Sequence, residues 1–292
     1  MTKELAFQPI LLCADDYGQT AAISHGIMHL AEKKRINAIS CLVNTDAWVK
    51  AAMPLAVLKE KCFIGLHLNL TWNRPLSKAW RHVYGNVFPR LPRLLRWCYN
   101  GRIDQRVIVS EIDMQLKAFY RQTGELPDFI DGHEHVHQFP QVREALLQIY
   151  QQTGLNGFLR TTINTSSRFS LAGFPKSQFI KFLGGKNFRR ILIKRQIPTN
   201  TTFSGIYTFK KAPDYRQYFK EFLRNMKPGG LIMCHPGLNV KDKQDPIGLY
   251  RHYEYSYLMS ETFLDDLASA NCRLMGKEES FETMGWSPKR DK

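Results

Sequence analysis

Residues 10–30 read ILLCADDYGQTAAISHGIMHL. The apolar run at residues 10–14 predicts a short strand, and a polar turn follows it directly. Thr20 is a typical helix N-cap, and Ile23, Ile27 and Leu30 recur at the spacing of one helix face. A strand, a polar turn at its carboxyl end and a helix form the repeating unit of α/β proteins.

The same alternation continues along the 292 residues. It favours a parallel α/β sheet or barrel. No internal repeat, low-complexity tract or linker divides the chain, so we expect one domain over residues 1–292. The further predicted strands are 38–43, 62–70, 129–131, 157–160, 202–209, 231–234 and 273–275, and the predicted helices are 48–58, 107–123, 140–153, 215–226 and 257–268.

Composition excludes several classes of protein. A hydrophobic content of 43% and a charged content of 23% exclude a disordered, collagen-like or coiled-coil chain. No uncharged apolar run approaches the roughly 20 residues of a membrane-spanning helix, and the run at residues 10–14 is too short for a signal-peptide core. The six cysteines form no CxxC pair, which favours reduced core thiols over disulfides. We therefore expect a cytoplasmic protein.

Positive charge is concentrated in two segments. Residues 74–106 hold eight basic residues and one acidic residue, and residues 176–195 hold seven basic residues and none that are acidic. Together they account for +14 of the net charge of +15. Both segments also carry aromatic residues, a combination that suits an anionic membrane, a phosphate-bearing substrate or nucleic acid. Nucleic acid is the weakest of these because no recognition motif occurs. The alternative is two solvated basic insertions, at about 72–106 and 165–200.

Four polar motifs each follow an apolar run. The first contains Asp15 and Asp16, adjacent carboxylates that could divide the roles of metal ligand and base, or form a polar turn. The second places His67 and Asn69 on one face of a strand, where a core histidine is the common alternative. Active sites of α/β proteins gather at the carboxyl ends of strands.

The third motif is the densest. His133, His135 and His137 alternate and would point to one side if the segment were extended, while Asp131 could orient a ligating ring. The fourth places His235 between an apolar strand and a Pro-Gly turn, where a structural histidine is equally common. The four motifs together form a hydrolytic metal set. No GxSxG elbow, P-loop or GxGxxG motif occurs, so neither serine-hydrolase chemistry nor a nucleotide cofactor is indicated.

In order, the motifs ADDYG (14–18), GLHLNLT (65–71), DGHEHVHQFP (131–140) and MCHPG (233–237) resemble the YdjC-like carbohydrate deacetylases, a family that includes chitooligosaccharide deacetylases and hopanoid-associated proteins. The resemblance extends from Ala14 to about Met259. It implies an irregular (β/α) barrel, similar to a TIM barrel, that hydrolyses the N-acetyl group of an amino sugar with one divalent metal. The ligand set favours zinc, whereas the family is commonly described with magnesium.

The resemblance also implies roles for individual residues. The implied metal ligands are Asp16, His67 and His133, the implied catalytic base is Asp15, and the implied general acid is His235. His135 and His137 are expected around the metal or in the substrate pocket. Arg160 and Arg251 are expected to hold the sugar or the catalytic carboxylate.

The two basic segments depart from the compact family pattern. A neutral chitin fragment does not call for such charge, so we expect an N-acetylated glycan that is phosphate-bearing or lipid-linked, at the inner face of an anionic membrane. A metal hydrolase of another amide or a phosphoester, and a non-catalytic membrane- or glycan-binding protein, are the alternatives. The sequence leaves a homo-oligomer open.

Overall fold

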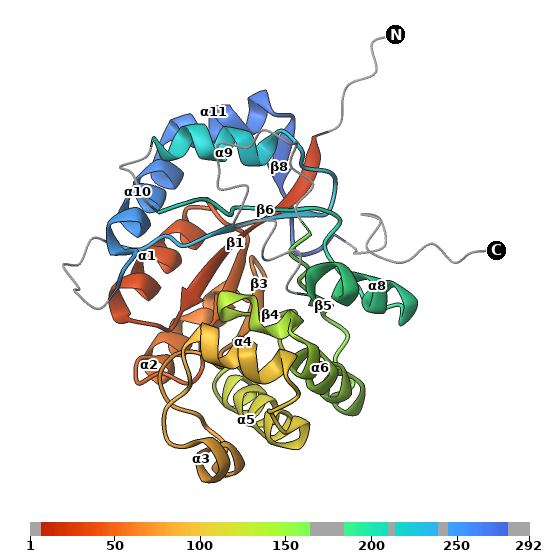
Figure 1. The fold of residues 1–292 in the computed structure, drawn as a ribbon. Helices are drawn as coiled ribbons and strands as arrows, with labels where there is room; N and C mark the ends of the chain where they lie inside the picture. Colours follow the sequence, from red (N-terminus) through yellow and green to blue (C-terminus); the bar gives the residue numbers. More distant parts are fainter. Residues whose placement is uncertain (1–6, 164–183, 210–213, 239–244, 280–292) are drawn as a thin grey trace.

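The computed structural model describes residues 7–163, 184–209, 214–238 and 245–279 (Figure 1). Its centre is an eight-stranded sheet in which all paired strands are parallel, in the order β5-β4-β3-β2-β1-β7-β6, with β8 also paired to β1. The strands are β1 (Gln8–Tyr17), β2 (Ala38–Cys41), β3 (Phe63–Leu68), β4 (Phe129–Gly132), β5 (Phe158–Leu159), β6 (Phe203–Ser204), β7 (Gly230–Cys234) and β8 (Cys272–Leu274). All eight predicted strands are present.

Strand β1 lies at the centre of the sheet and is long enough to pair with three other strands. Its middle pairs with β7, its first residues with β8 and its last residues with β2. Asn37 fills the seam where β8 gives way to β2: its side chain accepts from the Leu12 N–H at 2.7 Å and donates to the carbonyls of Ile10 and Met275. A buried amide thus satisfies backbone groups that the change of partner leaves unpaired.

The two ends of the strand order, β5 and β6, approach each other through the residues beside them. The Leu159 N–H donates to the Pro198 carbonyl at 2.9 Å, and the Asn200 side chain accepts from the Thr161 N–H at 2.7 Å. The sheet therefore curls into an incomplete barrel. The predicted irregular (β/α) barrel is confirmed.

Helices cover the outer face of the curled sheet (Figure 1). Thr20 caps the first helix as predicted, accepting from the Ile23 N–H at 3.3 Å. The α-helices are α1 (Ala21–Glu32), α2 (Trp48–Ala52), α3 (Lys78–Tyr84), α4 (Leu91–Tyr99), α5 (Gln105–Thr123), α6 (Pro140–Thr153), α8 (Lys186–Lys194), α9 (Tyr215–Leu223), α10 (Gly248–Met259) and α11 (Glu261–Ser269), with 3₁₀ turns η1 (Met53–Leu58) and η2 (His133–Gln138).

The sequence predictions differ from the structure in several helical regions. The helix predicted over residues 48–58 is α2 followed by the 3₁₀ turn η1. The single helix predicted over residues 257–268 is wrong: α10 ends and α11 begins at Ser260, whose hydroxyl accepts from the Phe263 N–H. The two basic segments contain helices that the sequence reading did not predict, namely α3 and α4 in the first and α8 in the second. Residues 164–183 of the second segment lie outside the described residues.

The sheet has an apolar core on each face. The larger packs the outer face against the helices, and the smaller fills the barrel interior with side chains that include Leu11, Phe63, Phe129 and Phe158. All six cysteines are buried and unpaired, as expected for core thiols. Among the described residues, none of the helices has the length and apolar character needed to cross a membrane.

Candidate active site

The inner face of the barrel becomes polar where the strands end. Side chains alternate between the two faces of a strand, so an inward residue is followed by another two positions later. Leu11 and Cys13 belong to the inner core, and Asp15 is the next inward position of β1. The same step along the other strands gives the inward positions of Ser40, His67, Asp131, Arg160 and His235.

A bulge at the end of β1 brings the second carboxylate to the same side. In a regular strand Asp15 and Asp16 would face opposite ways. The register with β2 shifts between Ala14 and Tyr17, and Asp16 has φ of 68°, a left-handed conformation that aspartate tolerates better than most residues. Both carboxylates therefore line one cavity.

Three predicted metal ligands converge in this cavity. One donor atom each from Asp16, His67 and His133 lies within 4.8 Å of the others. The Asp16 carboxylate is 3.0 Å from His133 Nδ1 and 3.5 Å from His67 Nε2, through the same oxygen Oδ1. One carboxylate and two imidazoles around a common point form a donor set that suits zinc or another transition metal.

Asp131 fixes the orientation of His67. Its Oδ1 accepts from His67 Nδ1 at 2.7 Å and from the Ser40 hydroxyl at 2.5 Å, and all three side chains are buried. A proton held on Nδ1 leaves the Nε2 lone pair of His67 directed at Asp16. This is the common arrangement of a metal-binding histidine whose other nitrogen donates to a carboxylate.

Arg160 holds the other aspartate. Its Nη2 and Nη1 donate to the two oxygens of Asp15 at 2.6 and 2.9 Å, and Nη2 also contacts Asp131. Burial alone would raise the pKa of Asp15, but Arg160, and to a smaller degree His67, lower it to about 2. Asp15 is therefore an ionised, oriented carboxylate beside the three converging donors.

Arg251 holds Asp16 from the opposite side. Its Nη2 donates to Asp16 Oδ2 at 2.8 Å and to Gln19, and its Nε donates to Asp245 at 2.7 Å. Burial would raise the pKa of Asp16, and Arg251 with His133 instead lowers it well below its usual range. The pairing uses Oδ2 and leaves Oδ1 facing the two histidines.

The segment of three alternate histidines is not extended. Residues 133–138 form a 3₁₀ turn in which Glu134 and His135 have positive φ, so the condition under which the three rings would share one side is not met. Gly132 permits the turn, because a Cβ there would lie 2.8 Å from His137 Nδ1. The rings therefore have three different surroundings.

Of the remaining two rings, one reaches the cavity. His135 lines it and packs edge-on against Phe203, and burial lowers its pKa to about 3. His137 is fully buried, contacts the Arg160 carbonyl through Nε2 at 2.9 Å, and has a pKa lowered by burial to about 4. His137 does not line the cavity, and its predicted role around the metal or in the substrate pocket stays a prediction. The side chain instead lies behind the backbone of Arg160.

His235 lies at the end of β7 and lines the cavity. Burial lowers its pKa to about 4, although Asp16 and Asp15 act in the other direction. Glu254, a buried residue of α10 that the sequence reading missed, accepts from the His235 N–H at 2.5 Å and from the Tyr207 hydroxyl at 2.6 Å. Burial raises the pKa of Glu254 to about 7. No motif links residues 207, 235 and 254, so only the fold reveals this cluster.

The cavity has a volume of about 860 Å³, and its polar lining includes Asp15, Asp16, His67, His133, His135 and His235. Its floor holds the carboxylates and histidines, and its walls are largely apolar and aromatic, as in many small-molecule sites. The wall residues are Trp72, Leu91, Pro92, Ile206, Tyr207, Phe209 and Met233, joined at the rim by Arg90.

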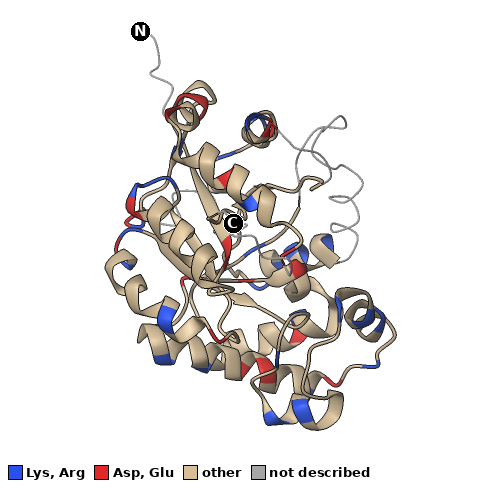
Figure 2. Ribbon diagram, turned by 90° about the vertical axis from the view of Figure 1, so that its left-hand side faces the viewer, with Lys and Arg blue, Asp and Glu red and all other residues tan. Residues whose placement is uncertain are grey.

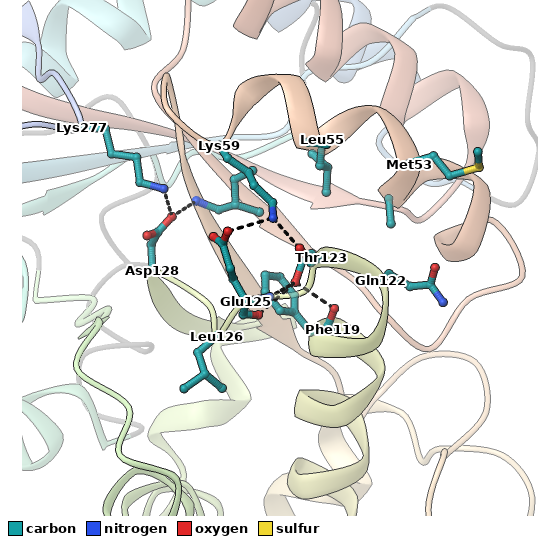
Figure 3. Close-up of a pocket in the computed structure, with 13 residues that line it drawn as sticks. Met53, Leu55, Lys59, Phe119, Gln122, Thr123, Glu125, Leu126, Asp128 and Lys277 are labelled. Carbon is teal, nitrogen blue, oxygen red and sulfur yellow. Dashed lines mark hydrogen bonds and ion pairs between the residues drawn. The ribbon is translucent and has the colours of Figure 1, made fainter.

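A second, much smaller hollow of about 50 Å³ lies among residues that precede β3 and β4 and residues at the end of α5 (Figure 3). Its two lysines are paired: Lys59 with Glu125 at 3.0 Å and Lys277 with Asp128 at 2.7 Å. Asp128 also accepts from the Ile64 N–H. These contacts join neighbouring elements and leave little room for a ligand.

Residues 9–269 match the YdjC-like protein family. The chain belongs to this family. The resemblance predicted from the four motifs is thereby confirmed, and the match includes every converging residue described above.

The individual relatives are distant. The chain is similar to a chitooligosaccharide deacetylase of Proteus mirabilis, with 29% identity over 58% of this chain and 68% of that protein, and to a carbohydrate deacetylase of Danio rerio, with 27% identity over 55% of this chain and 51% of that protein. It thus spans about half the length of the Danio rerio protein.

Among solved structures, the chain is similar to a protein of Enterococcus faecalis described as a putative cellobiose-phosphate cleavage protein. The TM-score is 0.70 with 18% identity, over 95% of this chain and 99% of that one. At this identity the likeness concerns the fold, and it extends over nearly the whole of both chains.

Proposed function

We propose that this YdjC-like protein is a metal-dependent hydrolase that removes the N-acetyl group from an amino sugar or glycan and releases acetate. One observation carries the proposal: three donors, Asp16, His67 and His133, converge beside a separate ionised carboxylate, Asp15. The names of the relatives as carbohydrate deacetylases point to the same reaction. We also propose that residues 1–292 form a single YdjC-like domain.

The donor set fits one divalent ion. Asp16 Oδ1, His67 Nε2 and His133 Nδ1 would hold it, and we favour zinc over magnesium because imidazole ligands suit zinc better. When bound, such an ion supplies Lewis acidity toward the acetamide carbonyl and increases the acidity of water. The buried pairing of Asp131 with His67 keeps the required tautomer in place.

The protein's own groups then move the protons. Asp15, held ionised by Arg160, accepts the proton of the attacking water, and His235 delivers a proton to the departing amine. Because the pKa of His235 is about 4, its ring is neutral at pH 7 before the reaction. The proton that His235 delivers is therefore the one that Asp15 has taken from the water, passed from Asp15 to His235 within the cavity that both side chains line. One water is consumed, the amide C–N bond breaks, and acetate and a free amino sugar form.

The cavity walls suit a sugar ring. Trp72 is 37% exposed at the mouth and offers an aromatic face to the apolar side of a ring, while His135 offers a polar edge. Arg251 and Arg160 hold carboxylates in the structure, so we assign both to positioning Asp16 and Asp15 rather than to binding the sugar.

The experiment is acetate release from a panel of N-acetylated sugars and glycans, with and without a metal chelator. Chelator-sensitive release supports the proposal. Full metal occupancy with no release from any N-acetylated sugar would contradict it, and would favour hydrolysis of another amide or of a phosphoester.

A second candidate concerns the partner rather than the reaction. Basic residues of the first segment are exposed on and beside α3 and α4, and Figure 2 shows them at the lower right of the molecule. The exposed basic side chains are Arg74, Lys78, Arg90, Arg93, Arg96, Arg102 and Arg106. We propose that this surface attracts an anionic membrane or a lipid-linked glycan, placing the protein at the inner membrane face. Flotation with anionic vesicles tests it: protein that stays in the bottom fraction at low salt would refute membrane attraction.

A further inference from the structure

One loop carries an aromatic side chain to the mouth of the large cavity. Residues 69–77 connect β3 with α3, and Thr71 and Trp72 of this loop line the cavity. Trp72 does not belong to the buried apolar core of the protein. Its place at the mouth therefore depends largely on the backbone that carries it.

A single buried side chain holds both backbone groups of Trp72. The Oδ1 atom of Asn69 accepts from the N–H groups of Thr71 and Trp72, both at 3.1 Å. Its Nδ2 atom donates to the Trp72 carbonyl at 2.7 Å. Asn69 is fully buried. Its amide therefore closes a turn around Trp72 and fixes the point at which the aromatic side chain leaves the loop.

A second buried amide holds Asn69 in the same way. Gln115, from the middle of α5 on the outer face of the sheet (Figure 1), accepts from the Asn69 N–H at 3.0 Å and donates to the Asn69 carbonyl at 2.7 Å. Glu111, one turn earlier on α5, accepts from the N–H groups of Leu76 and Ser77 at the far end of the loop. Two amides in series thus connect α5 to the aromatic residue at the mouth.

The amide of Gln115 is fully paired. Its two N–H groups go to the Asn69 carbonyl and to Glu111, the latter at 2.9 Å, and its oxygen takes the Asn69 N–H. Buried polar networks that are fully satisfied are rigid and specify one geometry. Gln115 is not among the described residues that line the cavity, so any effect that it has on a ligand passes through Asn69 and Trp72.

We propose that Gln115 is a positioning residue that presets Trp72 at the mouth of the cavity for contact with a ligand. A ring that is already held in its binding position loses less conformational freedom when the ligand arrives, so the affinity is higher. Gln115 thereby influences affinity without touching the ligand and leaves the reacting groups undisturbed. The kinetic part of this inference rests on the proposed deacetylase function.

The test compares Gln115→Met with Asn37→Leu. Each substitution removes a buried amide that is hydrogen-bonded to backbone groups, but Asn37 lies just before β2, at the end of that strand away from the cavity. Acrylamide quenching of Trp72 is taken as the difference between each protein and its Trp72→Phe counterpart. It should increase in Gln115→Met and stay at the wild-type value in Asn37→Leu. For an N-acetylated sugar, Gln115→Met should raise KM about fivefold with kcat nearly unchanged, while Asn37→Leu leaves both unchanged.

A double-mutant cycle tests the path from Gln115 to the ligand. In a Trp72→Ala background, adding Gln115→Met should raise KM no further. An equal increase in KM with and without Trp72 would overturn the proposal, and so would wild-type quenching of Trp72 in Gln115→Met. An increase in KM for Asn37→Leu as large as that for Gln115→Met would also overturn it, because the effect would then follow from lost stability.

Asn44→Ala provides a second variant if Gln115→Met does not fold. Asn44 reaches the same loop from the segment after β2 and donates to the carbonyls of Trp72 and Arg74 at 3.4 and 3.0 Å. The same changes in Trp72 quenching and in KM are expected for this variant. Wild-type values of both would refute the inference.

Failure of the inference can be told apart from failure of the proposed function. Quenching of Trp72 requires no ligand, and calorimetry on Asp15→Asn measures binding of N-acetylglucosamine without turnover. Increased quenching together with weaker sugar binding, both caused by Gln115→Met, supports the inference even if no acetate is released. Unchanged quenching or unchanged sugar binding refutes it.

Discussion

Replacing Asp15 with asparagine separates its catalytic role from its structural one. The substitution keeps the shape of the side chain but removes the charge that Arg160 holds at 2.6 and 2.9 Å. Arg160 keeps Asp131 as a partner, and Asp16, His67 and His133 are untouched. We therefore expect a folded protein that binds metal with wild-type affinity. Loss of a general base should reduce kcat about 10²- to 10⁴-fold.

The stability change follows from the pKa. The pKa of Asp15 falls from 3.8 to about 2 on folding, so its ionised form contributes about 2 kcal/mol at pH 7. Because the folded pKa is lowered, this contribution is present above pH 4 and is lost as the pH falls toward 2. Asp15→Asn should thus lower the free energy of unfolding by about 2 kcal/mol at pH 7, with a difference that shrinks in acid.

Arg160→Met is the matched comparison, because it leaves Asp15 and Asp131 buried together without their cation. It should cost about 3–5 kcal/mol at pH 7, and part of the loss should be recovered toward pH 5 as one carboxyl becomes protonated. Urea unfolding gives both free energies, equilibrium dialysis with zinc gives occupancy, and acetate release gives kcat. Loss of metal in Asp15→Asn, or turnover near that of the wild type, would refute the assigned division between the two aspartates.

Three further predictions concern the surroundings of the site. Burial raises the pKa of Glu254 from 4.5 to about 7, so the free energy of unfolding of the wild type should fall by about 3 kcal/mol as the pH rises from 4.5 to 7. Glu254→Gln should abolish this dependence on pH, and urea unfolding of both proteins from pH 5 to 8 checks it. Zinc at 100 times its Kd should raise the free energy of unfolding by about 3 kcal/mol. His133→Ala should abolish this stabilisation and His135→Ala should retain it, as measured by thermal melts with and without chelator. Gly132→Ala should destabilise by about 1–3 kcal/mol in the same melts, since its Cβ meets His137, and wild-type stability would contradict the tight turn.

Much of the fold could be predicted because it depends on local pattern. The eight apolar runs each became a strand of one parallel sheet, and the cap at Thr20 was evident from its residue type and position. The break at Ser260 could not be recognised from apolar spacing, because residues on both sides of it continue a helical pattern. The helices α3 and α4 were also missed because the segment was interpreted from its charge, as a basic insertion, although Leu94 and Cys98 of α4 lie at helical spacing and are both buried.

For the site, the sequence reading identified most of the residues at or near the ends of strands. Asp15, Asp16 and His67 lie at the ends of β1 and β3, His235 follows β7, and all four were predicted, as was Arg251 of α10. Arg90 and Glu254 belong to helices that no motif connects with the strands. The conformation of residues 133–137 could not be predicted, because a positive φ at two successive non-glycine residues depends on the close packing of Gly132 against His137.

The alternation of side chains along the strands explains why one barrel end holds so many charges. On β1, β2, β4, β5 and β7 the inward position two residues beyond the apolar core is polar, so Ser40, Asp131 and Arg160 meet without any of them leaving its strand register. Buried carboxylates in such number are stable only if cations or imidazoles share them. Arg160 and Arg251 meet that need for two of the carboxylates of the site. Neutralising Asp15 or Asp16 should therefore disturb the floor of the cavity, because each carboxylate is the partner of a buried arginine.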